Sequence, residues 1–350
     1  MTPIKILDGG LGTTLETHYS YKFSSSTPLW SSHLLLTHPD RQTILACHKE
    51  FVSSGAQVVS TATYQVSFEG FAATKTEEWP HGVPPEYIPQ FITSAINLAS
   101  SAAGTTNEIS LALGPLGATI LPNSAEYTGS YPPQYSSVDQ IQEWHYKRLV
   151  QLFLSCTEIE KVSYLAFETI PRLDEIIAIR KVMQRIDGGK RFWITVNFPG
   201  KGYRLPDGSG VKEIVEGMLD EEKGAEIPWG IGINCTKVSK LSVLVKMFEQ
   251  EVRKVVGDDA GEWPSLVLYP DGTKGEVYNV QTKEWELPDG EKGDNGNKLS
   301  WEDQIVEVVR ETRERGRWRE ILVGGCCRCL PEDIGRLRGL LLGYNEKGGG

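Results

Sequence analysis

Residues 162–196 read VSYLAFETIPRLDEIIAIRKVMQRIDGGKRFWITV, and this stretch shows most clearly how the chain is built. The apolar run at 162–167 predicts a strand, the amphipathic segment at 173–185 predicts a helix, and the apolar run at 192–196 predicts a second strand. A strand, a helix and a strand in this order are typical of a βα unit, in which the two strands lie parallel. The sequence therefore favours an α/β fold.

The same alternation continues through most of the chain. Further strands are predicted at 4–7, 57–62, 109–113, 229–233, 266–269 and 321–323, and further helices at 39–55, 138–157, 211–218, 240–256 and 301–313. Eight strands alternating with helices indicate a parallel sheet, and eight is the number that closes a (β/α)8 (TIM) barrel. An open doubly wound sheet is compatible with the same count.

Composition and charge narrow the classes of partner. The 350 residues carry a net charge of -10, with 39% hydrophobic and 23% charged residues and no basic cluster, which argues against nucleic-acid binding. No stretch approaches the ~20 apolar residues of a membrane span, and the start of the chain has no signal-peptide pattern. We therefore expect a cytoplasmic protein, a monomer or small homo-oligomer, that acts on small molecules away from membranes.

Three polar stretches interrupt the alternation, at 71–89, 121–137 and 271–298. In a barrel they follow the second, third and seventh strands, so we expect long loops at the face where barrel enzymes hold their sites. The glycine-rich stretch at 271–298 is predicted to be a flexible insertion. We expect residues 1–343 to form one barrel domain and 344–350 a disordered tail.

The cysteines carry the most specific chemical signal. Cys235 ends one predicted strand, and the pair Cys326-Cys327 follows another, 91 residues later and after two glycines. Three thiolates from two strand ends would leave tetrahedral Zn²⁺ one open position, which is typical of catalytic zinc. A tight turn of small residues without metal is the alternative. Cys329 is interpreted as a free thiol at the start of the next helix, or as a spare ligand.

Two carboxylates also lie at predicted strand ends. Asp8 precedes the flexible pair Gly9-Gly10, whose amides can hold a small carboxylate while Asp8 pairs with an ammonium group. A plain glycine turn is the alternative interpretation. Glu168 directly follows the strand predicted at 162–167 and places a second carboxylate at a strand end. Its alternative role is to cap the following helix or to pair with an arginine. His145 is interpreted as a helix-surface residue rather than a base.

Taken in order, eight segments resemble the homocysteine S-methyltransferase family. They are LDGGLGTTLE (7–16), TATYQ (61–65), GPLGA (114–118), AEYTGSY (125–131), FETIP (167–171), GINCT (232–236), YP (269–270) and GGCCR (324–328). The resemblance covers nearly the whole chain. It implies a (β/α)8 barrel that moves a methyl group onto the sulfur of homocysteine to give methionine.

The resemblance also implies roles for individual residues. One zinc ion per chain would bind at Cys235, Cys326 and Cys327 and activate the homocysteine thiol in its fourth position. The other expected contacts are Asp8 and Glu168 with the substrate ammonium, Gly9 and Gly10 with its carboxylate, and Tyr64 and Asn234 in or behind the pocket.

The methyl donor expected from the resemblance is a sulfonium, S-methylmethionine or S-adenosylmethionine. Tyr127, Tyr131 and Trp285 can attract such a cation through their rings, with loop packing as the alternative. A betaine-dependent enzyme, a non-catalytic zinc- or thiol-binding redox sensor and a metal-free barrel are rival interpretations. Two departures from the family pattern are Asp271 in place of an asparagine and Cys329 in place of a polar residue.

Overall fold

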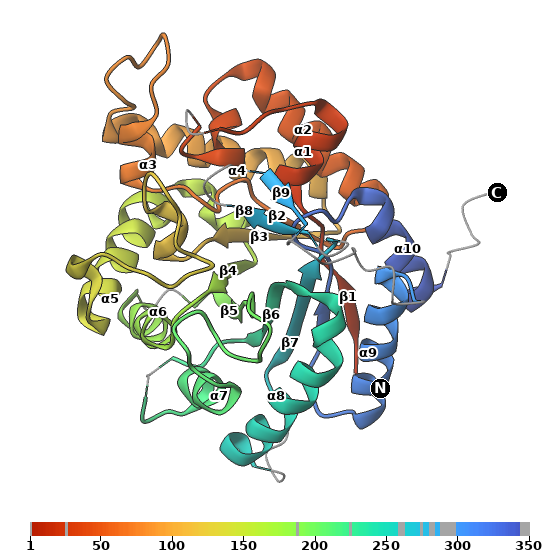
Figure 1. The fold of residues 1–350 in the computed structure, drawn as a ribbon. Coiled ribbons are helices and arrows are strands. Elements are labelled where there is room, and N and C mark those ends of the chain that lie inside the picture. The colour runs from red at the N-terminus through yellow and green to blue at the C-terminus, as the bar shows by residue number, and fades with distance from the viewer. Residues whose placement is uncertain are drawn as a thin grey trace, which may run out of the picture.

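The computed structural model of the protein describes residues 2–24, 27–186, 189–223, 226–257, 263–273, 276–279, 284–287 and 299–343. Seen along its axis, an eight-stranded parallel sheet lies at the centre and helices surround it (Figure 1). The barrel strands are β1 (Ile4–Ile6), β2 (Val58–Ser60), β3 (Glu108–Leu113), β4 (Tyr164–Ile170), β5 (Arg191–Val196), β6 (Gly230–Lys237), β7 (Ser265–Asp271) and β10 (Ile321–Val323).

The sheet curls back on itself. Its strand order is β1-β10-β7-β6-β5-β4-β3-β2, and a parallel bridge between Leu7 and Val58 brings β2 beside β1. The amide of Asp8 donates to the carbonyl of Val58 at 3.1 Å across this junction. The eight predicted strands and the (β/α)8 barrel are thereby confirmed, and the open doubly wound alternative is excluded.

Ten helices accompany the strands in the part of the chain that the structure describes. They are α1 (Leu11–Tyr19), α2 (His38–Ser53), α3 (Phe68–Ala73), α4 (Ile88–Ala103), α5 (Val138–Arg148), α6 (Leu173–Ile186), α7 (Val211–Leu219), α8 (Leu241–Val256), α9 (Trp301–Arg315) and α10 (Pro331–Leu342). The six predicted helices are present. The one predicted at 138–157 is shorter, because α5 is followed by a π-helical turn, Leu149–Leu154.

Four helices, α1, α3, α4 and α10, have no counterpart among the predicted elements. α1 starts directly after the glycines at 9 and 10, and α3 has only 6 residues, so neither shows a full amphipathic repeat. α4 begins inside the polar stretch 71–89, where Pro89 fits the first turn of a helix. It buries Phe91, Ala95 and Ala99. Tertiary packing therefore decides these segments.

The core has two layers. Inside the barrel, residues from opposite strands form one small buried cluster: Leu7, Val58, Tyr164, Ala166, Trp193, Val267, Tyr269 and Leu322. A much larger cluster fills the space between strands and helices. Because successive strand residues point to opposite faces, the inward residues at the strand ends surround one spot.

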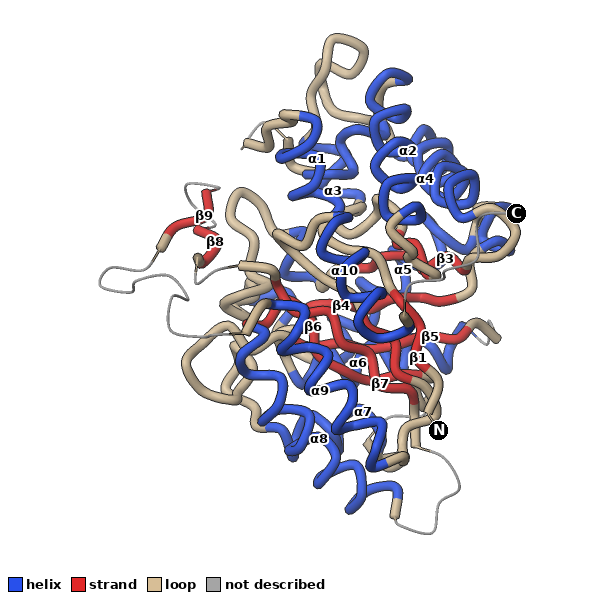
Figure 2. Tube along the Cα trace, turned by 90° about the vertical axis from the view of Figure 1, so that its right-hand side faces the viewer, coloured by secondary structure: helices blue, strands red, loops and turns tan. Residues whose placement is uncertain are grey.

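The carboxyl ends of the strands lead into the long loops, as expected from the sequence. The insertion at 271–298 contains a short antiparallel pair, β8 (Val277–Asn279) and β9 (Glu284–Glu286). Figure 2 shows this hairpin beyond one end of the barrel, at the left of the view. The rest of the predicted flexible insertion, 274–275, 280–283 and 288–298, and the predicted tail 344–350 lie outside the described residues. No described helix is long and apolar enough to cross a membrane.

Candidate metal centre and substrate pocket

A cavity of about 290 Å³ opens at the carboxyl ends of the barrel strands. Asp8 after β1, Ser60 at the end of β2, Glu168 in β4, Cys235 in β6 and Cys326 after β10 all line it. The chain separates these residues widely, and closure of the barrel brings them together. The cavity lies near the lower end of the ~300–1,000 Å³ range of small-molecule sites.

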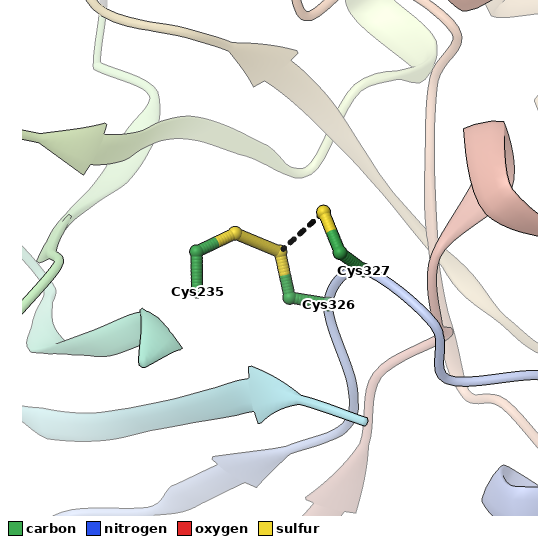
Figure 3. A group of neighbouring side chains, drawn as sticks. All are labelled: Cys235, Cys326 and Cys327. Atoms are coloured by element: carbon green, nitrogen blue, oxygen red, sulfur yellow. Dashed lines mark hydrogen bonds between the residues drawn. A yellow bond between two sulfur atoms is a disulfide. The ribbon is translucent and has the colours of Figure 1, made fainter. Parts of the chain in front are cut away.

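The three predicted zinc ligands converge at this cavity (Figure 3). One Sγ atom each of Cys235, Cys326 and Cys327 lies within 4.8 Å of the others, and a disulfide joins Cys235 to Cys326. The Sγ of Cys327 lies 4.0 Å from that of Cys326. Cys235 has a φ of 42°, a backbone conformation that residues other than glycine rarely adopt. It lies where the register between β6 and β7 shifts.

The donor set fits a single thiophilic metal ion. Zinc binds thiolate sulfur at about 2.3 Å, and a tetrahedron of that size separates its sulfurs by about 3.8 Å. The Sγ atoms of Cys326 and Cys327, 4.0 Å apart, are close to this spacing, and the Sγ of Cys235 lies within 4.8 Å of both. A disulfide carries no thiolate, so metal binding and the Cys235–Cys326 bond exclude one another.

Backbone hydrogen bonds hold the cysteine loop against its neighbours. The amide of Cys326 donates to the carbonyl of Pro270 at 2.8 Å, and the amide of Gly325 donates to that of Asp8 at 3.0 Å. A side chain on Gly10 would place its Cβ 2.5 Å from the carbonyl oxygen of Cys326. The loop after β1 and the loop after β10 therefore need a glycine where they touch.

Burial raises the pKa of both candidate ammonium-binding carboxyls. Asp8 is 3% exposed and has a pKa of about 7, despite accepting bonds from the amide and hydroxyl of Ser60 at 2.7 and 2.9 Å. Burial and the nearby Asp8 raise the pKa of Glu168 to about 8, while a hydrogen bond from Tyr269 acts in the opposite direction. A cation between the two carboxylates would offset the desolvation of each charge and would lower both pKa values.

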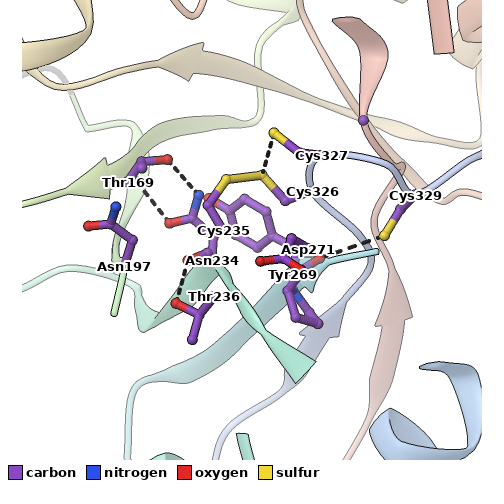
Figure 4. Close-up of a disulfide and its surroundings, with 12 residues drawn as sticks. Thr169, Asn197, Asn234, Cys235, Thr236, Tyr269, Asp271, Cys326, Cys327 and Cys329 are labelled. Carbon is purple, nitrogen blue, oxygen red and sulfur yellow. Dashed lines mark hydrogen bonds between the residues drawn. A yellow bond between two sulfur atoms is a disulfide. The ribbon is translucent and has the colours of Figure 1, made fainter. Parts of the chain in front are cut away.

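Asn234 is not among the residues that line the pocket. Its Oδ1 accepts from the amide of Thr169 at 2.8 Å, and its Nδ2 donates to the Thr169 hydroxyl at 2.7 Å (Figure 4). Thr169, the residue after Glu168, has a φ of 62°. Asn234 thus ties the strand end that carries Glu168 to the strand end that carries Cys235. Tyr64, by contrast, lines the cavity.

The two glycines of the predicted carboxylate site are not equivalent. Both line the cavity, but the amide of Gly10 donates to the carbonyl of Cys329 at 2.9 Å. Its hydrogen-bonding capacity is therefore already used. Gly9 and the first amides of α1, at Leu11 and Gly12, remain beside the cavity for a carboxylate group.

The three expected cation-binding aromatics separate into two groups. Tyr127 and Trp285 line the cavity, whereas Tyr131 does not. Tyr131 instead donates to Glu175, whose other oxygen lies 2.8 Å from Nε2 of His145. The role expected for Tyr131 is therefore not supported by its position.

His145 is 2% exposed, so its interpretation as a helix-surface residue is wrong. Its partner Glu175 also accepts from the amide of Leu116 at 2.7 Å, and the Tyr131 hydroxyl accepts from the amide of Gly117 at 3.2 Å. This buried network fixes the loop after β3. A single histidine in an amphipathic pattern does not reveal a buried partner far along the chain.

Both departures from the family pattern lie next to the cavity but outside its lining. Oδ1 of Asp271 accepts from the amide and hydroxyl of Thr273 at 3.2 and 2.5 Å, and burial raises its pKa to about 6. The sulfur of Cys329 lies 3.7 Å from the carbonyl of Pro270. Cys329 is thus a buried thiol outside the three-sulfur group.

Two residues at the cavity were given no role from the sequence. Tyr269 is buried inside the barrel, and its hydroxyl lies 2.7 Å from that of Thr195 and bonds to Glu168. Glu126 is 6% exposed and brings a third carboxyl to the cavity. Both lie within segments that resemble the family, YP (269–270) and AEYTGSY (125–131). Their position in these motifs is the sequence signal that could have indicated a place at the site.

Comparison with known proteins indicates the family of the chain. A family model described as homocysteine S-methyltransferase matches residues 5–341. A betaine-homocysteine S-methyltransferase of Drosophila melanogaster is 27% identical over 99% of this chain and 96% of its own length. The homocysteine S-methyltransferase YbgG of Bacillus subtilis is 27% identical over 95% of this chain and 92% of its own. The metallated form of the homocysteine methyltransferase MmuM of Escherichia coli shares the fold, with a TM-score of 0.67 and 24% identity over 96% of both chains.

Proposed function

Because the chain belongs to the homocysteine S-methyltransferase family, we propose that it transfers a methyl group from a sulfonium donor, S-methylmethionine or S-adenosylmethionine, to homocysteine. The observation that carries this proposal is the meeting of three cysteine sulfurs with Asp8 and Glu168 at one cavity. A thiol-activating group and an ammonium-binding group are the two features that an amino-acid thiol substrate requires.

In this proposal Asp8 and Glu168 bind the ammonium of homocysteine, and the amides near Gly9 bind its carboxylate. Tyr269 holds Glu168 through its hydroxyl, and Ser60 holds Asp8. Cys235, Cys326 and Cys327 would hold zinc, which would lower the pKa of a coordinating thiol from its free value of about 8.5. The homocysteine thiol gives up its proton to water, its sulfur bonds to the methyl carbon while the sulfonium S–C bond breaks, and the donor leaves as a thioether with an uncharged sulfur.

The charge of the cavity supports a donor with net positive charge. Three carboxyls line it: Asp8 and Glu168, which bind the homocysteine ammonium in this proposal, and Glu126, which is left for the donor. No lysine, arginine or histidine occurs among its described lining residues. S-methylmethionine and S-adenosylmethionine each carry a net charge of about +1 at neutral pH, because their carboxylate is balanced by both an ammonium and a sulfonium. Betaine is net neutral, and its carboxylate would find no basic side chain in the described lining.

Betaine is nevertheless the second candidate donor, because one relative is named a betaine-homocysteine S-methyltransferase. The test is methionine formation from homocysteine by reduced, zinc-loaded protein, with each of the three donors supplied separately. We expect turnover with a sulfonium and at least tenfold less with betaine. The reverse order would replace the sulfonium proposal by the betaine one.

Zinc content is measured on the same samples. We expect about one zinc per chain under reducing conditions, and loss of zinc and activity in Cys326→Ser. One zinc without turnover on any donor would instead favour a zinc- or thiol-binding redox sensor, for which the Cys235–Cys326 disulfide is the motivating observation. A reduced, folded protein that takes up no zinc would favour a metal-free barrel.

A further inference from the structure

The hairpin of β8 and β9 contributes a side chain to the cavity although it lies outside the barrel. Trp285, in the centre of β9, pairs with residue 278 of β8 and lines the cavity together with residues from the barrel loops. Every other described residue in that lining lies before residue 270 or after residue 324. The insertion thus supplies one aromatic ring to a pocket built otherwise by the barrel.

Contacts to the cysteine loop hold the hairpin in place. Arg328 directly follows Cys327, and its guanidinium donates to Glu276, the residue before β8, at 3.0 Å. The same guanidinium lies 6.0 Å from the ring centroid of Trp285. The backbone of Arg328 is in turn fixed, because its amide donates to the Thr13 hydroxyl at 2.8 Å.

Two further bonds fix the base and the strands of the insertion. The amide of Gly272 donates to the carbonyl of Cys327 at 2.8 Å, so the insertion starts against the cysteine loop. Nδ2 of Asn279 donates to the carboxylate oxygens of Glu286 at 3.1 and 3.0 Å, which links β8 to β9. The position of Trp285 therefore depends on the loop that carries Cys326 and Cys327.

We propose that Trp285 is a specificity-determining residue that contacts the sulfonium end of the methyl donor, and that Arg328 and Glu276 are its positioning residues. The inference rests on the proposed function. Its basis is an aromatic face in a cavity whose described lining has no basic side chain and, besides the two carboxyls that bind homocysteine in the proposed function, has that of Glu126. Such a face attracts an onium cation, and Tyr127 and Glu126 line the same cavity.

The test compares Trp285→Leu with Trp285→Phe in the zinc-loaded, reduced protein. Leucine fills part of the space but has no π-face, whereas phenylalanine keeps a ring. We expect Trp285→Leu to raise the KM for S-methylmethionine about tenfold and Trp285→Phe to raise it less than about threefold. The KM for homocysteine and the zinc content should stay within about twofold of wild type. Leu287→Ala, at an exposed position two residues further on, is the matched control.

An unchanged donor KM in Trp285→Leu would overturn the inference. Equal donor KM values in Trp285→Leu and Trp285→Phe would also overturn it, because the residue would then be a wall without cation recognition. Calorimetric titration of S-methylmethionine without homocysteine measures donor affinity independently of turnover. If wild type binds this donor but forms no methionine, the proposed function fails while the contact to Trp285 is still tested. If wild type does not bind it, the inference fails.

The positioning role of Glu276 is tested with Glu276→Gln. This substitution removes the ion pair with Arg328 but keeps the cysteines, Arg328 and Trp285 themselves. We expect a donor KM raised threefold or more with kcat and zinc content retained, because the ring is present but less well held. The double variant Glu276→Gln/Trp285→Leu should be no worse than Trp285→Leu alone. Independent, multiplicative losses in the double variant would refute positioning through Trp285.

Discussion

Asp8 and Glu168 show how a single cavity changes two ordinary carboxyls. Both have pKa values raised by burial, to about 7 and about 8, so each is partly protonated near neutral pH. An ammonium group bound between them favours the ionised forms and lowers both pKa values. We therefore predict that homocysteine binding releases protons and tightens as the pH rises from about 6 to about 8.

Calorimetry in two buffers with different ionisation enthalpies measures this proton release. In Glu168→Gln we expect homocysteine affinity to fall at least tenfold, with the proton release reduced and the zinc content unchanged. The amide keeps the size of the side chain but carries no charge. Unaltered homocysteine affinity in this variant would remove Glu168 from the ammonium site.

The three-sulfur group makes its own prediction at the residue scale. Cys327→Ser should lose most bound zinc, because a hydroxyl is a poor zinc ligand, whereas Cys329→Ser should keep it. Cys329 lies two residues away, buried and outside the group, which makes it the matched control. Metal analysis under reducing conditions decides the matter. Equal zinc loss in both variants would mean that disruption of the loop, rather than ligand identity, controls binding.

At the scale of elements, the ends of β4 and β6 form one unit. Thr169 and Cys235 both have positive φ values, and the side-chain amide of Asn234 bridges the two strands at this point. Strained conformations of this kind persist only where surrounding bonds enforce them, and they concentrate at functional sites. These two hydrogen bonds between Asn234 and Thr169, called the clamp below, hold the strand ends that carry Glu168 and Cys235 relative to each other.

Asn234→Ala is therefore predicted to lower the free energy of unfolding by about 1–3 kcal/mol, because buried hydrogen-bonding groups of Thr169 lose their partner. The KM for homocysteine should rise as well, since Glu168 and Cys235 lose their common support. Urea denaturation and steady-state kinetics measure the two effects. The control is Asn97→Ala, whose side chain accepts one bond from Lys161 at the surface and should change stability by less than about 0.5 kcal/mol. Similar effects in the two variants would contradict the clamp.

At the scale of the whole molecule, the raised carboxyl pKa values oppose stability. A carboxyl whose pKa is higher in the folded state binds more protons there than in the unfolded chain. The stability that the protonated carboxyl allows is fully present at pH values below about 4. It is lost as the pH rises to about 7–8, where the buried carboxyl must ionise. His48, whose pKa burial lowers to about 4, acts in the opposite direction below about pH 6.5.

The difference between wild type and Asp8→Asn/Glu168→Gln isolates the carboxyl contribution from that of the histidines. We predict that the double variant gains stability relative to wild type as the pH rises from 5 to 8, in reduced, metal-free protein without substrate. Chemical denaturation at several pH values measures it. A difference that does not change with pH would show that the two carboxyls are ionised without cost. We also expect residues 1–343 to unfold in one transition, as a single closed barrel should.

Local patterns in the sequence were sufficient for much of this protein. Alternating apolar runs predicted all eight barrel strands, because a buried parallel strand needs a continuous apolar segment. Glycine-flanked cysteines at two strand ends predicted the three-sulfur group, because strand ends of a barrel face one cavity. The ordered motifs predicted the family.

Only the tertiary structure decided the features that depend on partners far apart in the chain. Closure of the sheet required the pairing of Leu7 with Val58, and the buried position of His145 required Glu175. It likewise kept Asn234 out of the cavity lining and brought Trp285 into it. A sequence pattern records which face of an element is apolar, but burial, hydrogen bonding and pKa are set by what the folded chain places against that face.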